Sequence, residues 1–270
     1  MTAVDYRNQT TLITGASAGI GEQFARELAA RGSRLVLVAR RAERLERLAK
    51  QLEAAHGIQA FAVTADLSRP GTGSSLADEV HHLGIQVTSL VNCAGFGTFG
   101  QFHTEDPQRL ADEIAVDVTA VVDITRAFIA GLRSTGTGVL INVASMAAYQ
   151  ATPNMAVYGA TKAFVLSFTE ALWQESLGTG LKVIALSPGA TDTEFFDVIG
   201  TKDAAGGTRL QTPQQVVHTA LRALDRRNPP PSIAVGALNR AALWAQRLVS
   251  RRRTVLTLAA MTKSNPRARQ

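Results

Sequence analysis

Three side chains in the middle of the sequence have the types and spacing needed for acid–base chemistry. Tyr158 and Lys162 are four residues apart in a helical pattern, so both project from one helix face. A free phenol titrates near pH ~10, and a neighbouring ammonium lowers that pKa by stabilising the phenolate. Taken alone, such a pair is commonly found on a solvent-exposed helix face without a catalytic role. Ser145, however, stands thirteen residues before Tyr158 at the end of an apolar run, and this combination favours a proton-transfer site.

A second chemical feature is a glycine-rich loop near the N-terminus. Thr14–Gly21 reads Thr-Gly-Ala-Ser-Ala-Gly-Ile-Gly, directly after the apolar run Thr10–Thr14. Glycines in such a strand-to-helix loop let the backbone approach a pyrophosphate, whose charge then faces the positive end of the helix. A tight turn alone would not require three glycines and two hydroxyls together. The candidate cofactor-binding residues of this loop are Gly15, Ser17, Gly19, Ile20 and Gly21.

The end of the next apolar run indicates which dinucleotide is bound. NAD-binding proteins place an acid there for the ribose 2′-hydroxyl, whereas an arginine accommodates a 2′-phosphate. This sequence has Arg40 and Arg41 and no acid, and a guanidinium fits a phosphate through two hydrogen bonds. Both are candidate cofactor-binding residues, Arg40 the favoured one, since Arg41 also fits the start of a solvated helix. The pattern predicts NADP(H).

Short apolar runs alternate with helical patterns through the first 235 residues. Both faces of the runs should be covered, because they lack in–out alternation; they are Thr10–Thr14, Arg34–Ala39, Ala60–Ala65, Ser89–Asn92, Val139–Val143, Lys182–Ser187 and Ser232–Val235. The helical stretches are Ile20–Arg31, Arg41–Ala55, Leu76–Leu83, Pro107–Leu132, Met155–Leu177 and Thr212–Asp225. This alternation predicts an α/β fold, a Rossmann-type doubly wound parallel sheet, with residues 1–235 as a single catalytic domain.

Composition narrows the class of protein. Of 270 residues, 46% are apolar, which is enough for one large core. Cys93 is the only cysteine, which excludes a disulfide scaffold. The five histidines lack metal-ligand spacing, so we expect no metal site. Without a recognisable leader or an apolar run of roughly 20 residues, we expect a cytoplasmic protein.

Taken together, these motifs resemble the short-chain dehydrogenase/reductase family over about residues 8–235. The matching segments are Thr14–Gly21, Asp66-Leu67, Asn92–Gly95, Ser145, Tyr158 with Lys162, and Pro188–Thr193. The resemblance implies an oxidoreductase with about seven parallel strands, usually a homodimer or homotetramer. In such an enzyme Tyr158 would exchange a proton with the substrate oxygen and Ser145 would hydrogen-bond it. Lys162 would bind the nicotinamide ribose and lower the tyrosine pKa.

The same resemblance assigns further contacts to the cofactor. Asp66 and Leu67 would meet the adenine, and Asn92 and Gly95, with Ala94 between them, the adjoining ribose region. The nicotinamide side would be met by Pro188, Gly189, Thr191 and Thr193.

One position departs from the family pattern. Many relatives have an asparagine in the central helix that helps to hold a water beside the lysine, where this chain has Asp117. The main-chain carbonyl could keep that water, so Asp117 is retained as a candidate catalytic residue. Alternatively its carboxylate pairs with Lys162 and holds the phenol pKa higher. We expect retained activity with an altered pH profile.

The loop after the sixth expected strand supplies the candidate substrate site. Relatives use the region that here spans Glu194–Leu210 as a lid, and its apolar anchors suggest a small hydrophobic carbonyl or alcohol substrate. Aromatic and methionine side chains that could line the same pocket, or equally pack in the core, are Phe96, Phe99, Met146, Tyr149 and Met155.

The net charge of +6 comes from the C-terminal segment. Residues 222–270 contain eleven Lys or Arg and one acid, whereas residues 1–221 carry a net −4. Residues 236–270 therefore form a basic extension, with helical periodicity over 237–250. Packing on the body or on a partner subunit is favoured, and weak contact with an anionic membrane surface is the alternative. Nucleic acid is not an expected partner, because no reading motif accompanies the arginines.

Two classes of function follow from these features. The first is an NADP(H)-dependent oxidoreductase that moves hydride between nicotinamide and a carbonyl carbon. The second is a non-catalytic regulatory or scaffold protein that keeps the nucleotide cradle. Intact Ser145, Tyr158 and Lys162 favour the enzyme, and only Asp117 favours the alternative.

Overall fold

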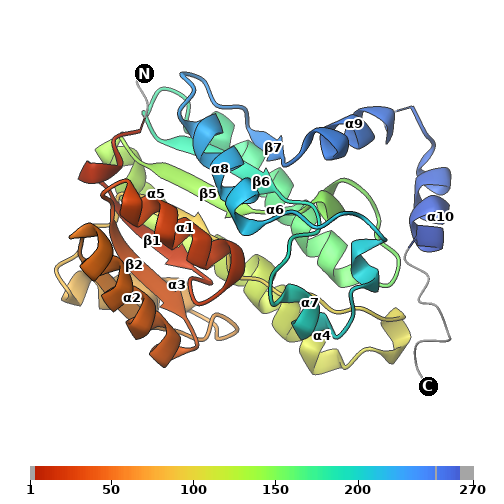
Figure 1. Ribbon diagram of the computed structural model, residues 1–270, viewed down its shortest axis with the longest axis horizontal. Helices are drawn as coiled ribbons and strands as arrows, with labels where there is room; N and C mark the ends of the chain where they lie inside the picture. The colour runs from red at the N-terminus through yellow and green to blue at the C-terminus, as the bar shows by residue number, and fades with distance from the viewer. Residues whose placement is uncertain (1–3, 247, 262–270) are drawn as a thin grey trace.

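The structure is a computed structural model that describes residues 4–246 and 248–261. Within these residues a single sheet of seven parallel strands runs in the order β3-β2-β1-β4-β5-β6-β7 (Figure 1). The strands are β1 Thr10–Thr14, β2 Arg34–Ala39, β3 Ala60–Thr64, β4 Ser89–Asn92, β5 Val139–Val143, β6 Lys182–Ser187 and β7 Ser232–Ala234. This arrangement confirms the predicted Rossmann-type doubly wound sheet.

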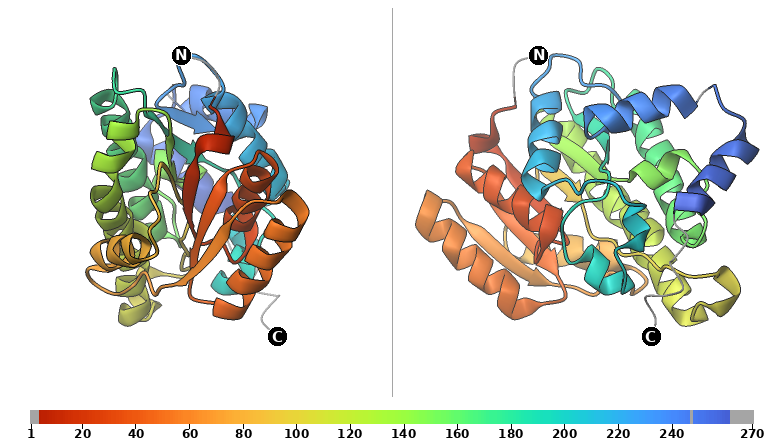
Figure 2. Two further views of the ribbon diagram at one scale, coloured as in Figure 1. Left: turned by 90° about the vertical axis from the view of Figure 1, so that its left-hand side faces the viewer. Right: turned by 45° about the vertical axis from the view of Figure 1, so that its right-hand side comes forward.

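Helices cover the sheet on both faces and make three layers (Figure 2). One face packs against α1 Gly19–Ala30, α2 Ala42–His56 and α8 Pro213–Leu224. The other packs against α3 Thr72–His82, α5 Ala120–Thr135 and α6 Ala156–Glu175. Because the strands of the middle layer are shielded from water on both sides, β1 and β6 are buried at every residue. The order of the strands reverses between β1 and β4, where a doubly wound sheet leaves a crevice at its carboxyl edge.

The long central helix predicted over Pro107–Leu132 contains a change of helical form. It consists of α4 Pro107–Ile114, a π-helical turn Ala115–Thr119 and α5, which ends at Thr135. A π turn has one more residue than an α turn, and such turns are frequent at functional sites. Asp117 lies in the middle of it and is fully buried. The periodicity of the sequence gave no indication of this turn.

The helix predicted over Leu76–Leu83 begins four residues earlier, at Thr72. Its first turn, Thr-Gly-Ser-Ser, lacks an apolar period but is held by packing and by a hydrogen bond. Gly73 is buried against α5, and its N–H donates to Asp123 Oδ2 at 2.6 Å. Tertiary contacts thus supply the helical preference that the side chains of this turn lack.

The C-terminal extension forms two helices where the sequence predicted one over 237–250. They are α9 Ala237–Gln246 and α10 Arg251–Met261, which lie beyond the β7 edge of the sheet (Figures 1 and 2). Arg247, and the end of the extension at 262–270, lie outside the described residues. In the described part of the chain no helix is both long and apolar enough to cross a membrane.

The close approach of α3 to α5 gives a test of the packing. A Cβ on Gly73 would lie 2.4 Å from the carbonyl carbon of Asp123, which is backbone and cannot rotate away. Gly73→Ala should therefore lower the free energy of unfolding in urea by about 1–3 kcal/mol. Gly131→Ala is the matched control, because nothing lies within 4 Å of that Cβ. It should raise stability by about 0.5–1 kcal/mol through helix propensity. Equal effects at the two sites would contradict the packing argument.

Candidate active site

A cleft of about 940 Å³ opens at the carboxyl edge of the sheet. Its floor is made by the residues that follow consecutive strands, from Gly15 after β1 to Pro188 after β6. Its outer wall includes apolar side chains of the C-terminal extension: Leu243, Val249, Leu258 and Met261. Strand ends and the extension therefore share one cavity.

The glycine loop forms one end of this cleft from backbone alone. A Cβ on Gly21 would lie 2.3 Å from the carbonyl oxygen of Gly15, and one on Gly15 would lie 2.9 Å from the backbone of Ala94. Gly19 has φ +57° and begins α1, whose first turn receives no side-chain cap from Ala18. An uncapped helix N-terminus beside a bare loop is a site for a phosphate anion. These residues fit a dinucleotide pyrophosphate.

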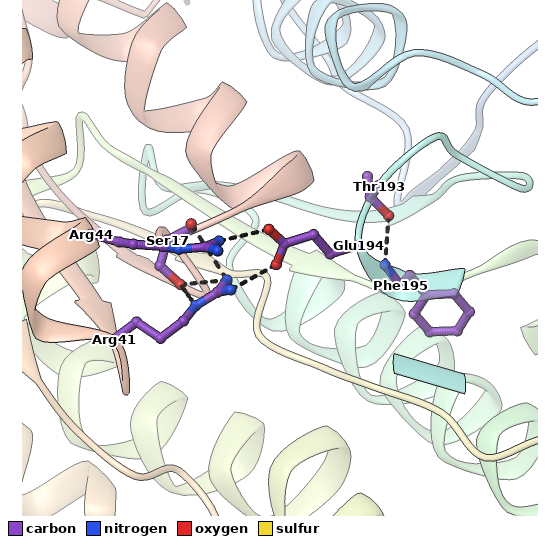
Figure 3. Close-up of polar contacts among 6 residues, drawn as sticks. All are labelled: Ser17, Arg41, Arg44, Thr193, Glu194 and Phe195. Atoms are coloured by element: carbon purple, nitrogen blue, oxygen red, sulfur yellow. Dashed lines mark hydrogen bonds and ion pairs between the residues drawn. The ribbon is translucent and has the colours of Figure 1, made fainter. Parts of the chain in front are cut away.

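Arg41 lies at the same end of the cleft, between the glycine loop and the loop after β6 (Figure 3). Its Nε and Nη2 atoms lie 3.2 and 3.1 Å from Ser17 Oγ, to which they donate. Its Nη1 lies 2.7 Å from Glu194 Oε2, and Arg44 Nη1 lies 2.6 Å from the other oxygen of that carboxylate. Arg40 lines the cleft and is exposed. Sequence reasoning preferred Arg40, but Arg41 is the arginine that contacts the glycine loop.

The candidate acid–base residues meet in the middle of the cleft. Ser145 follows β5 as expected and lines the cleft with Tyr158, and its hydroxyl acts to lower the pKa of the Tyr158 phenol. Lys162 lies one turn further along α6, with Nζ 5.5 Å from the centre of the Tyr158 ring. The ring of Phe195 lies 5.3 Å from the same tyrosine and covers it from the loop after β6. A hydroxyl, a phenol and an ammonium thus converge beside the glycine cradle.

Comparison with known proteins agrees with this geometry. Residues 9–204 match the family model for the short chain dehydrogenases. The chain belongs to the short-chain dehydrogenase/reductase family. It is accordingly an oxidoreductase that uses a nicotinamide cofactor.

Individual members of the family resemble the chain over most of its length. Sulfoacetaldehyde reductase 2 of Chromohalobacter salexigens is 36% identical over 203 residues, which are 74% of this chain and 79% of that protein. The 7beta-hydroxysteroid dehydrogenase of Collinsella aerofaciens is 32% identical over 182 residues, 67% of this chain and 68% of the relative.

Solved structures of dehydrogenases share the fold. A short-chain dehydrogenase from Sphingobium yanoikuyae, solved in complex with NADPH, has a TM-score of 0.77 and 31% identity, covering 89% of this chain and 93% of that one. A 7beta-hydroxysteroid dehydrogenase has a TM-score of 0.84 at 25% identity, covering 96% of this chain and 100% of the other.

Most of the residues that the sequence assigned to cofactor binding line the cleft of this dehydrogenase. The exception is Asn92, whose amide donates to Thr125 and to Asn142 in the core below β4 and β5. Asp66 lines the cleft, and its carboxylate accepts from the backbone and hydroxyl of Ser68. Among the candidate pocket residues, Phe96, Met146 and Met155 line the cleft, whereas Phe99 and Tyr149 lie outside its lining.

Asp117 and Lys162 form a buried ion pair beneath the cleft floor. Lys162 Nζ lies 3.0 Å from Asp117 Oδ2, and the two side chains are 7% and 0% exposed. The N–H of Phe96 donates to the other oxygen of Asp117 at 3.1 Å. Burial alone would lower the pKa of Lys162, but Asp117 raises it above its ordinary value. Of the two roles considered for Asp117, this geometry supports pairing with the lysine.

Burial raises the pKa of the Tyr158 phenol above its ordinary value of 10.0. Lys162 and the Ser145 hydroxyl oppose that rise, whereas the negative charge of Asp117 adds to it. The lysine therefore stabilises the phenolate less than the sequence suggested, because Asp117 neutralises much of its charge. The phenol is protonated at neutral pH.

Glu113 is a second buried carboxyl that sequence reasoning missed. It is fully buried one helical turn before Asp117, and Thr98 Oγ1 donates to its Oε2 at 2.8 Å. Within the described residues its Oε1 has no hydrogen-bond partner. Burial raises the pKa of Glu113 to about 7, and the charge of Asp117 adds to the rise. Two acids four apart on an otherwise apolar helix face were the available indication.

The ion pair predicts how Asp117→Asn would change the pH dependence of turnover. Loss of the negative charge should lower the Tyr158 pKa, because Lys162 would then act on the phenolate unopposed. The limb of the kcat/KM profile that reports the tyrosine should move to lower pH, with activity retained. Asp78→Asn on the exposed face of α3 controls for the lost charge. An unchanged profile in Asp117→Asn would refute the role.

Glu113 predicts a pH-dependent stability. Its pKa is about 7 in the folded chain and near 4.5 when unfolded, so the folded state holds the proton more tightly. This contribution is full below pH ~4.5 and is lost as the pH rises to about 7. Glu113→Gln should therefore gain on the order of 1–3 kcal/mol relative to the natural chain between pH 5 and pH 8 in urea titrations. The same gain in Glu46→Gln, on the exposed face of α2, would count against this assignment.

Proposed function

We propose that the protein is an NADP(H)-dependent oxidoreductase that interconverts a hydrophobic carbonyl compound and its alcohol, with Tyr158 as general acid/base. The observation that carries the proposal is the convergence of Ser145, Tyr158 and Lys162 in a cleft that also holds the glycine cradle. When bound, the nicotinamide supplies or accepts the hydride. The residues of the chain bind the cofactor and the substrate and transfer one proton.

Each side chain has a separate part in that proton transfer. The Ser145 hydroxyl hydrogen-bonds the substrate oxygen beside the phenol and holds it in reach. The Tyr158 hydroxyl donates its proton to that oxygen as a carbonyl is reduced, or takes one from an alcohol. Lys162, held by Asp117, stabilises the phenolate that reduction leaves behind. Because burial keeps the phenol protonated at neutral pH, the site is suited to reduction.

The walls of the cleft support a hydrophobic substrate. Met155, Phe195 and Tyr158 gather around Gly97, and Phe96, Leu258 and Met261 also line the cleft. One relative is named as a 7beta-hydroxysteroid dehydrogenase, and a solved structure of a 7beta-hydroxysteroid dehydrogenase matches 96% of this chain. A bulky apolar ketone or alcohol fits these surroundings better than a small polar one.

Preference for NADP(H) over NAD(H) rests on the charge at the end of β2. Arg41 contacts Ser17 of the glycine loop, Arg44 pairs with the same Glu194 as Arg41, and Arg40 is exposed at the end of β2. Three guanidinium groups at this edge favour a cofactor that carries a 2′-phosphate.

The extension is proposed to belong to the catalytic unit. Its helices contribute to the cleft wall, and Gln246 Nε2 donates to the carbonyl of Tyr149 at 3.0 Å. These contacts support packing on the body of the protein. Membrane contact through Trp244 and Arg251–Arg253, all exposed, is the alternative, and the cytoplasmic location stays a prediction from the sequence.

We also propose a homodimer or homotetramer, as the family resemblance implies. Phe164 of α6 is 43% exposed and stacks on Phe168 with ring centres 5.9 Å apart. An aromatic pair on an outer helix face is suited to burial between two copies of the chain.

Tyr158→Phe tests the proposed chemistry. NADPH consumption against a panel of aldehydes, ketones and 3-oxoacyl thioesters should fall by roughly 100-fold or more, because the general acid is lost. The dissociation constant for NADPH, measured by fluorescence titration, should change little. Tyr6→Phe is the matched control: that hydroxyl is buried far from the cleft and lacks a partner among the described residues. Full turnover in Tyr158→Phe would refute the mechanism, and no turnover in the natural chain would favour the scaffold alternative.

A further inference from the structure

A carboxylate of the chain itself lies on the arginines that a cofactor phosphate would need. Glu194 Oε2 lies 2.7 Å from Arg41 Nη1, and Oε1 lies 2.6 Å from Arg44 Nη1 (Figure 3). Glu194 stands in the loop after β6, whereas both arginines belong to the start of α2, more than 140 residues earlier. The contact therefore joins two edges of the cleft and is not a local helix pair.

Arg41 is held on two sides in this arrangement. Its Nε and Nη2 donate to Ser17 Oγ, and its remaining terminal nitrogen donates to Glu194. The guanidinium is thus oriented by the glycine loop, and its outward fork is occupied by an oxyanion. Two arginines that share one oxyanion have the geometry with which proteins bind phosphate groups.

The charge of Glu194 is fixed by these contacts. Hydrogen bonds from Arg41, and then from Arg44, hold the pKa of Glu194 below its ordinary value. The carboxylate is therefore ionised at neutral pH, and it cancels one of the two positive charges. A 2′-phosphate has more than one negative charge near neutrality and would be repelled by a carboxylate bound at the same nitrogens.

The Glu194 carboxylate can also separate from the two arginines. Its side chain is 45% exposed, and those of Arg41 and Arg44 are 42% and 47% exposed. Water can solvate all three groups when the pair opens, so the cost of separation is small compared with that of a buried pair.

We propose that Glu194 is a specificity-determining residue that occupies the 2′-phosphate site, so that NADP(H) binds only by displacing it. The inference rests on the NADP(H) preference proposed above. Glu194 lowers the affinity for cofactors with a 2′-phosphate and leaves cofactors without one unaffected. It thereby narrows the difference in affinity between NADPH and NADH that the arginines alone would produce.

Displacement of Glu194 would also be felt on the substrate side of the cleft, because the neighbouring residue lies against Tyr158. The next residue, Phe195, covers Tyr158, and the N–H of Phe195 lies 3.3 Å from Thr193 Oγ1 (Figure 3).

A merely structural role for Glu194 is the competing explanation: if the residue only holds this loop in place, its loss would affect all cofactors equally.

Binding of the adenosine-phosphate halves of the two cofactors distinguishes the two explanations. Dissociation constants of 2′,5′-ADP and 5′-AMP, which differ by the 2′-phosphate, would be measured by calorimetry with the full chain, together with those of NADPH and NADH. Glu194→Gln should bind 2′,5′-ADP and NADPH about three- to tenfold more tightly, and 5′-AMP and NADH within about twofold of the natural chain. Glu194→Ala should act in the same direction.

Two control variants distinguish failure of the proposed role of Glu194 from failure of the NADP(H) preference. Asp197→Asn removes an exposed carboxylate three residues further along, in the short helix α7 Phe195–Ile199, and should leave all four constants unchanged. Arg41→Ala should weaken 2′,5′-ADP and NADPH by about tenfold or more. Failure of that variant to weaken them would refute the NADP(H) preference itself. If Arg41→Ala behaves as expected but Glu194→Gln binds NADPH no more tightly, or shifts NADPH and NADH equally, the role of Glu194 is wrong.

Discussion

The ion pair between Asp117 and Lys162 is the interaction on which the rest of the site depends. Both groups are out of water, so neither can lose its partner without leaving an uncompensated buried charge. Their position explains several local features. The π turn bears Asp117 itself, and a Cβ at Gly95 would lie 2.9 Å from Lys162 Nζ. The loop after β4, the central helix and α6 are thereby fixed to one another directly beneath the tyrosine.

The same pair determines which protonation state the tyrosine keeps. A lone lysine beside a phenol would favour phenolate, but this lysine is already neutralised, and Glu113 provides a second acid close by. Two carboxyls and one ammonium cannot all be charged in an apolar interior at low cost, so Glu113 keeps its proton up to about neutral pH. Under the mechanism proposed above, the tyrosine therefore begins a reduction as the proton donor.

The sequence predicted the sheet well because its strands are short, continuous apolar runs bounded by loops: all seven begin where expected, and only β3 and β7 end one residue early. It predicted the positions of Ser145 and Tyr158 because each is fixed by a local element. It failed where tertiary contacts decide. The π turn, the early start of α3 at Thr72 and the inward amide of Asn92 depend on packing between distant segments. Nothing near Arg41 in the sequence indicates Glu194.

Two of the cations that line the cofactor cleft, Lys162 and Arg41, are each paired with a carboxylate of the chain, but the two pairs differ in burial. Asp117 is fully buried and must remain with Lys162, so any cofactor has to accept a lysine that is already neutralised. Glu194 is 45% exposed and can be exchanged for another anion. The pair in the middle of the cleft is therefore electrostatically fixed, whereas the pair at the glycine-loop end is exchangeable and, under the specificity proposed above, controls which cofactor is bound. The net charge of the whole chain has no bearing on either, because the excess of basic residues lies in the C-terminal segment.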